Sequence, residues 1–130
     1  MKKFTFCVLA IIMTISIFFV PEFAEANQLK TQTYHVTGQA KVWEGSYSYR
    51  ILSGKKELVK GYGTASIGAP DWGNFEEFIK VEQKKDLTLE LFEVSQEDGK
   101  EINKLIIPLD QIKGKVYYNK AFRNVKVALK

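Results

Sequence analysis

A two-residue alternation of apolar and polar side chains runs through most of this chain, and it most strongly limits what the chain can fold into. In the segment 34–42, apolar or small residues occupy every second position, with threonine, glutamine and lysine mostly between them. Similar alternation returns in 46–51, 75–81 and 87–92. Because successive side chains of a β-strand point to opposite faces, the pattern predicts half-buried strands rather than helices.

Turn residues separate the predicted strands at intervals of about ten residues, which is typical of all-β sandwiches and barrels. Ser53-Gly54-Lys55-Lys56 predicts a hairpin turn before a strand at 57–66, and 83–86 is a second polar turn. A polar loop over 95–103 precedes a last strand at 105–109. The proline within that strand places it at the edge of a sheet or at its own end.

The first 26 residues differ from the rest and predict export. Two lysines precede the uncharged run 4–20, and Ala24-Glu25-Ala26 has the small-x-small pattern of a signal-peptidase site. We expect a cleaved signal peptide, 1–26, and a single exported domain, 27–130, with no membrane insertion after cleavage. An uncleaved anchor is the alternative, because the run approaches the ~20 apolar residues of a spanning helix.

Charge and cysteine content narrow the class of partner. The single cysteine, Cys7, lies in the predicted signal peptide, so no disulfide is expected in the exported domain. The formal net charge of +4 fits a neighbourhood of anionic wall polymers or lipid headgroups. The basic residues are scattered along the chain, which argues against nucleic acid as a partner.

Catalytic patterns are weak in this sequence. His35 is the only histidine, and it has no cysteine partner with which to form a zinc site or a nucleophilic pair. It alternates out of phase with its apolar neighbours, so it should face solvent or a sheet rim. Glu76 and Glu77 are adjacent in a predicted strand, so they point to opposite faces and cannot act as paired carboxylates. We therefore expect no enzyme and no cofactor.

An acidic cluster around the 95–103 loop raises the possibility of calcium binding. Its members are Glu93, Glu97, Asp98 and Glu101. Their spacing is not that of an EF-hand loop. A turn at Asp98-Gly99 with solvated carboxylates is the simpler interpretation, and no metal site is predicted.

Three aromatic residues, Trp43, Tyr47 and Tyr49, recur at even spacing and would share one strand face. If exposed, Trp43 and Tyr47 form a candidate aromatic face on which a carbohydrate could stack. If buried, the row is one wall of a sandwich core, which is the favoured interpretation for Tyr49.

The turn-rich loop "SIGAPDWGNF" is the second candidate for an interaction or structural site. The candidate site residues in this loop are Pro70, Asp71, Trp72, Gly73 and Phe75. Proline at the second position of a type I turn and a positive φ at Gly73 would reverse the chain sharply. Trp72 then either caps the sandwich over Phe75 and Phe78, which we favour, or points outward as a partner anchor.

Three blocks of the sequence together resemble the immunoglobulin-like domain of bacterial spore-germination proteins. They are "VTGQAKVWEGSYSYRI", "GYGTASIGAPDWGNFEEF" and "LTLELFEVSQEDGKEINKLIIPL", and the resemblance covers about 34–109. It implies an immunoglobulin-like β-sandwich of about seven antiparallel strands. It also implies a secreted or envelope location in a Gram-positive-type bacterium and a non-catalytic binding or scaffold role linked to sporulation or germination.

The resemblance also has two departures. The family domain often follows a GerM-type domain, which we do not expect here, and its proline-rich lead-in strand is missing. We expect the C-terminal extension, 110–130, to cover the vacated sheet edge as an added strand, because unpaired edges invite aggregation. The expected protein is a monomer whose partner is an unknown envelope protein or wall polymer. The alternatives are a wall-polymer binder with exposed aromatics and lysines, and a secreted protease inhibitor presenting loop 68–74.

Overall fold

The computed structural model describes residues 30–130, so the predicted signal peptide lies outside the described residues. Within them, the strands are β1 (Thr31–Ala40), β2 (Ser46–Ser53), β3 (Lys56–Thr64), β4 (Gly73–Glu82), β5 (Leu87–Val94), β6 (Glu101–Pro108) and β7 (Phe122–Leu129). A single-turn 3-10 helix, η1 (Trp43–Gly45), joins β1 to β2. No helix among residues 30–130 combines the length and the apolar character that a membrane crossing requires.

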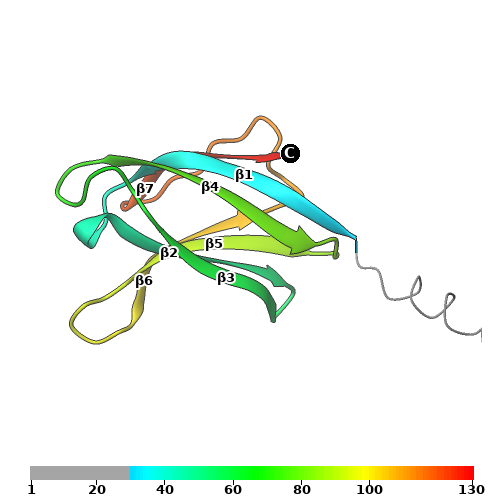
Figure 1. Ribbon diagram of the computed structural model, residues 1–130, viewed down its shortest axis with the longest axis horizontal. Coiled ribbons are helices and arrows are strands. Elements are labelled where there is room, and N and C mark those ends of the chain that lie inside the picture. Colours follow the sequence, from blue (N-terminus) through cyan, green and yellow to red (C-terminus); the bar gives the residue numbers. More distant parts are fainter. Residues whose placement is uncertain (1–29) are drawn as a thin grey trace, which may run out of the picture. The chain divides into compact units, whose positions relative to one another are not determined.

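The strands form two antiparallel sheets that face each other (Figure 1). One sheet has the order β4-β1-β7 and the other has the order β3-β2-β5-β6. Every strand pairing in both sheets is antiparallel. The predicted all-β, immunoglobulin-like sandwich of about seven strands is confirmed.

Alternating side chains from both sheets meet in the core, as the sequence pattern predicts. Val36 in β1, Ile51 in β2 and Leu89 in β5 are fully buried. Tyr47 also lies in this core, and its hydroxyl donates a hydrogen bond of 2.6 Å to the Glu77 carboxylate of β4 in the opposite sheet. Burial and then the Glu77 contact raise the pKa of Tyr47 well above its usual value, so a neutral phenol ties the sheets together.

The C-terminal extension contributes β7, which pairs with β1 at the edge of the three-stranded sheet. Phe122 and Val125 point into the core and are fully buried. A bridge between Tyr117 and Val125 covers part of the outer edge of β7. The extension is therefore part of the sandwich and contributes to its core.

The strand β6 begins four positions earlier than the sequence pattern indicates, at Glu101 rather than Leu105. The predicted polar loop 95–103 is correspondingly shorter. Asn103 has a φ of 55°, and the β5–β6 register shifts between Leu91 and Glu93. This bulge breaks the two-residue alternation, which explains why the first part of the strand is not visible in the pattern. Pro108 ends β6, an edge strand, as expected.

A candidate binding surface around Trp43

Trp43 leaves the sandwich because the backbone of η1 turns through two left-handed residues. Glu44 has a φ of 51° and Gly45 a φ of 72°, and the Gly45 N–H donates to the Val42 carbonyl at 3.0 Å. Trp43 is consequently 56% exposed, whereas Tyr47 is only 2% exposed. The candidate aromatic face of Trp43 and Tyr47 is thus not formed, because the turn breaks the strand alternation: Tyr47 lies in the core wall and Trp43 lies outside it.

A side chain of β5 holds the backbone of Trp43 in place. The Trp43 N–H donates a hydrogen bond of 2.8 Å to Glu93 Oε1 at the end of β5. Glu93 Oε2 accepts a second bond of 3.0 Å from the Asn103 side-chain amide of β6. Glu93 therefore uses both carboxylate oxygens to hold η1 and β6 in place, while the indole ring stays exposed.

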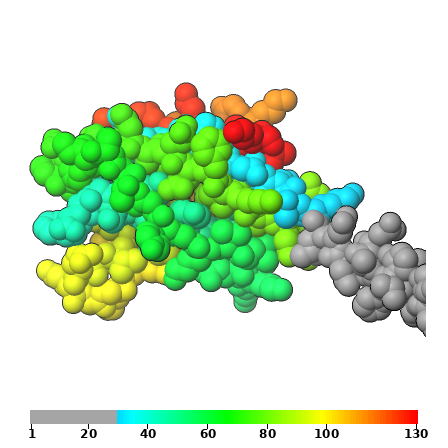
Figure 2. Space-filling view, viewed as in Figure 1, coloured from blue at the N-terminus to red at the C-terminus, as the bar shows by residue number. Residues whose placement is uncertain are grey.

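Trp43 lines two hollows. The first has a volume of about 200 Å³ and contains Tyr62 and Ser48 in its wall; the second has a volume of about 380 Å³ and contains Ile102 and Glu97. We call this region the Trp43 surface and define it by Trp43, Tyr62, Val94, Gln96, Glu97 and Ile102. In Figure 2 the blue-green η1 turn and the yellow β5–β6 loop lie one above the other at this end of the domain.

The Trp43 surface combines exposed apolar groups with carboxylates. Tyr62 is 84% exposed, and Val94 and Ile102 are each 40% exposed. The charged residues that line the hollows are Glu93 and Glu97, and no described lysine or arginine lines either one. An aromatic surface with an acidic rim suits a partner that brings apolar contact and positive charge.

Trp72 has neither of the two placements considered from the sequence. It is half-buried, with the Arg123 guanidinium 4.3 Å and the Lys41 ammonium 5.0 Å from its ring centroid. Phe75 is buried, but Phe78 is 49% exposed on the outer face of β4. A cap over both phenylalanines is therefore wrong, because successive residues of a strand point to opposite sides and Phe75 and Phe78 are three positions apart. The ring instead packs against two cations of its own chain.

The loop that carries Trp72 is folded back onto η1. The Ala69 N–H donates to the Val42 carbonyl at 2.8 Å, and the Ala65 N–H donates to the Gly45 carbonyl at 2.7 Å. A Cβ atom at Gly68 would lie 2.7 Å from the Gly45 nitrogen. The glycine at position 68 is therefore required by the close approach of two backbones.

The turn geometry in this loop differs from the expected one. The Asp71 N–H donates to the Gly68 carbonyl at 3.2 Å, so Pro70 occupies the third turn position, and the Ala69–Pro70 peptide bond is cis. A type I turn with proline second is therefore wrong. Gly73 opens β4 without a positive φ. Its role is steric, because a Cβ there would lie 2.6 Å from the Ile67 nitrogen.

The four acidic residues of the cluster have separate structural partners or face solvent. Glu101 binds the Arg50 guanidinium through both oxygens at 2.7 Å, and this contact lowers the pKa of Glu101 to about 2. Asp98 accepts the Lys100 N–H at 3.0 Å, Glu93 anchors η1, and Glu97 is exposed. Across residues 30–130, no group of three or more metal-binding side chains is placed to hold an ion.

His35 lies on the outer face of β1, as its phase predicts. Its ring stacks on Phe78 with centroids 4.4 Å apart, and its Nε2 lies 2.8 Å from Glu76 Oε2. Glu76 points outward, whereas Glu77 accepts the inward Tyr47 hydroxyl. The two glutamates do lie on opposite faces of β4.

Of the members of the Trp43 surface that sequence reasoning did not assign to a site, Tyr62 is the one with a signal in the sequence. It lies between Gly61 and Gly63 in β3, and a Cβ at Gly61 would lie 2.5 Å from the Tyr49 hydroxyl oxygen. Both glycines face inward because tyrosine rings of β2 lie over them. The alternation Gly-Tyr-Gly was the available signal, since glycines on the inner face leave the tyrosine on the outer face.

Comparison with known proteins places this fold in a family. Residues 24–100, more than half of the chain, match the model of the Gmad2 family, described as the immunoglobulin-like domain of bacterial spore germination. No curated protein and no solved structure matched the chain. The match includes η1, the glycine-dependent loop and the first five strands, and it ends just before β6. The chain belongs to the family of immunoglobulin-like domains of bacterial spore germination.

Proposed function

We propose that this germination-related domain is a non-catalytic, exported binding module of the bacterial cell or spore envelope, and that it binds through the Trp43 surface. The observation that carries the proposal is the exposed indole on a fixed backbone: Trp43 is 56% exposed, although Glu93 anchors its main chain. Tryptophan in such a preorganised position is a frequent binding hot spot, because little freedom is lost when a partner covers it.

The position of the surface in the domain supports a binding role. The η1 turn, the β3–β4 loop and the β5–β6 loop lie at one end of the sandwich (Figure 1). The first described residues, at the start of β1, lie at the other end, where Thr31 pairs with Glu82. A partner can therefore reach the Trp43 surface without meeting the point where the chain enters the domain.

The two alternative functions receive unequal support. Exposed Trp43 and Tyr62 rings favour binding to a wall polymer, but no described lysine lines the hollows beside them. Protease inhibition requires an extended loop that enters an active site. Loop 68–74 is instead hydrogen-bonded back onto Val42 and Ser66, so no observation favours the inhibitor.

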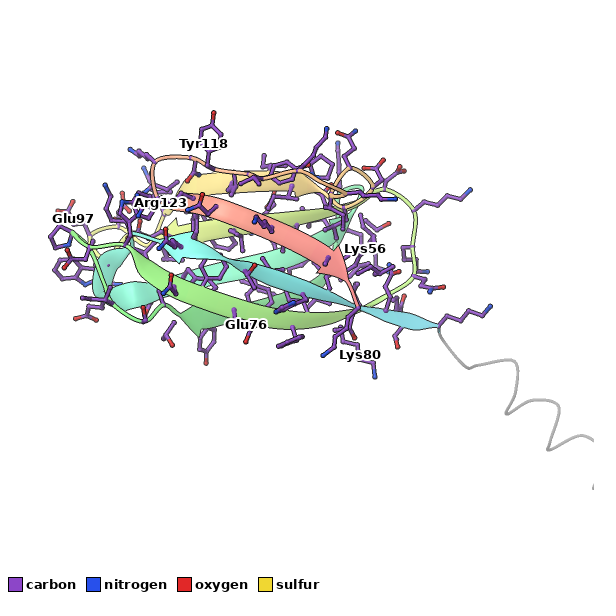
Figure 3. All side chains as sticks on the ribbon, turned by 90° about the horizontal axis from the view of Figure 1, so that it is seen from above. Lys56, Glu76, Lys80, Glu97, Tyr118 and Arg123 are labelled. Atoms are coloured by element: carbon purple, nitrogen blue, oxygen red, sulfur yellow. The ribbon has the colours of Figure 1, made fainter. Side chains whose placement is uncertain are left out.

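A pull-down with matched variants tests the proposal. The wild-type domain, Trp43→Ala and Tyr118→Ala are each incubated with a purified envelope fraction from sporulating cells and with culture supernatant. Tyr118 is a suitable control because it is 75% exposed and projects from the β6–β7 connection, away from Glu97 (Figure 3).

We expect the envelope fraction to retain wild type and Tyr118→Ala equally and to retain at least about fivefold less Trp43→Ala. Equal retention of all three proteins would show that the Trp43 surface is not used. Failure of the wild type to bind envelope material would overturn the binding role itself. Thermal unfolding of each variant shows that the fold is intact.

A further inference from the structure

We infer that the Trp43 surface receives a basic polypeptide segment, with a lysine or arginine side chain of the partner placed over the Trp43 ring. This inference rests on the proposed function and adds the chemical class of the partner to it. Three observations carry it. They are the cations that lie over the ring of Trp72, the carboxylates around Trp43, and the lining and volumes of the two hollows.

The half-buried indole ring of Trp72 is covered by cations of its own chain. The Arg123 and Lys41 side chains both lie over its ring, at 4.3 and 5.0 Å from the centroid. Cations prefer this position because the face of an indole carries negative potential. Trp43 is the more exposed ring, and none of the lysines or arginines among residues 30–130 lies over it. Its ring is therefore open to a cation from outside.

The rim of the Trp43 surface has the complementary charge. Glu97 lines the larger hollow, and the exposed Glu44 follows Trp43 directly in η1. Lys100 is the one cation of the β5–β6 loop, against the carboxylates of Glu97 and Asp98. An acidic rim on a chain of net charge +4 attracts a basic segment and repels an acidic one.

The two hollows fit neighbouring side chains of a peptide better than one compact ligand. Trp43 lines both of them, and their volumes are about 200 and 380 Å³. Val94 borders both, and Ile102 adds apolar contact to the larger one. An extended segment crossing Trp43 would place the aliphatic stem of a basic residue against these groups and its charge near Glu97.

The test uses Trp43 as its own reporter. The chain has two tryptophans, so Trp72→Phe leaves Trp43 as the only one. This variant is titrated with the peptide acetyl-Gly-Lys-Val-Lys-Val-Lys-Gly-amide, with the same peptide carrying glutamate in place of lysine, and with the neutral tetramer of N-acetylglucosamine. Trp43 fluorescence is recorded. The two indole N–H signals of the wild type in an NMR titration give a second readout in case Trp72→Phe is unstable.

We expect a saturable change at Trp43 with the lysine peptide only, weakened at least about threefold between low and physiological salt. The double variant Glu44→Gln, Glu97→Gln should weaken binding by about three- to tenfold. Its matched control is Glu57→Gln, Asp110→Asn, which removes two exposed carboxylates near the opposite end and should leave affinity unchanged.

The outcomes separate this inference from the proposed function. Binding of the sugar tetramer but not of the lysine peptide would overturn the basic-peptide inference and leave a wall-binding module standing. Equal loss in both charge variants, or none in either, would show that the rim carboxylates do not select the ligand, which also overturns it. Both proposals would be overturned if the envelope fraction retained Trp43→Ala as well as wild type and Trp43 fluorescence did not change with any of the three ligands.

Discussion

Single glycines set the geometry on which the tryptophan loop depends. We predict that Gly73→Ala lowers the free energy of unfolding by about 2–3 kcal/mol, because the added Cβ meets backbone atoms of Ile67 that cannot rotate away. Urea denaturation measures the loss. Gly99→Ala is the control: it has a φ of +72° but no atom within 4 Å of the added Cβ, so it should cost about 1 kcal/mol. Equal losses would contradict the steric account.

The Arg50–Glu101 pair predicts a specific loss of stability in acid. The pKa of Glu101 is about 2 in the folded chain against an ordinary value of 4.5. Its contribution is therefore complete above pH 4.5 and is lost as the pH falls from there toward 2. Wild type should be more stable than Glu101→Gln at pH 6, as measured by urea denaturation. The difference in the free energy of unfolding should shrink as the pH falls from 4.5 to 2. A difference that stays constant down to pH 2 would show that the ion pair is not its source.

Residue-level prediction from sequence succeeded where alternation holds and failed where a left-handed residue interrupts it. His35 and the Glu76–Glu77 pair lie on the faces that their phases predict. Trp43 does not share a face with Tyr47, because the positive φ values in η1 rotate the chain between them. The sequence contains Gly45 but does not show that Glu44 would also be left-handed, so the exposure of Trp43 required the structure.

At the scale of elements, β7 completes a core that the family match alone does not cover. The match ends at residue 100, yet Phe122 of β7 is fully buried against the other strands. We predict that Phe122→Ala costs about 3–5 kcal/mol of unfolding free energy. Lys126→Ala, at an exposed position of the same strand, should change it by less than about 0.5 kcal/mol. Similar values for the two variants in urea denaturation would show that β7 is peripheral.

The Trp72 loop and β7 are coupled through the Arg123 guanidinium. Trp72→Ala and Arg123→Ala each remove this contact, so their effects on stability should not add. A double-mutant cycle in urea should give a coupling of about 0.5–1 kcal/mol, as for an exposed cation–π pair. Pairing Trp72→Ala with Lys126→Ala provides the control and should give additive effects. Additivity in both cycles would mean that Arg123 does not stabilise the loop.

Alternation and turn residues predict the number and order of most elements, because each strand has one buried face. The start of β6 escaped this reasoning, since the left-handed Asn103 shifts the register within the strand. An added strand was anticipated from the alternation in 125–130 and from the need to cover a sheet edge, and β7 spans Phe122–Leu129. The cis bond before Pro70 could not be inferred, because the residues around it are equally compatible with a trans turn.

Considered as a whole, the sandwich carries different chemistry at its two ends. The carboxylate-rimmed Trp43 surface lies at one end, whereas the turns at the other end carry the exposed lysines Lys55, Lys56, Lys84 and Lys85. Figure 3 shows Glu97 and Lys56 on opposite sides of the strand bundle. The buried Tyr47–Glu77 bond and the shared core join the sheets between these ends. The loops at both ends are therefore held in place by the same core between the two sheets.

This shared packing predicts that the two sheets unfold together. Trp43 lies in η1, next to the four-stranded sheet, while Trp72 contacts Arg123 of β7 in the three-stranded sheet. Trp72→Phe and Trp43→Phe each leave one reporter, and in both variants the urea midpoint from fluorescence should equal the midpoint from far-UV circular dichroism. Independent sheets would instead give a tryptophan midpoint that departs from the circular dichroism midpoint in at least one variant. Coincidence is expected because neither sheet can keep its apolar face buried once the other has separated from it.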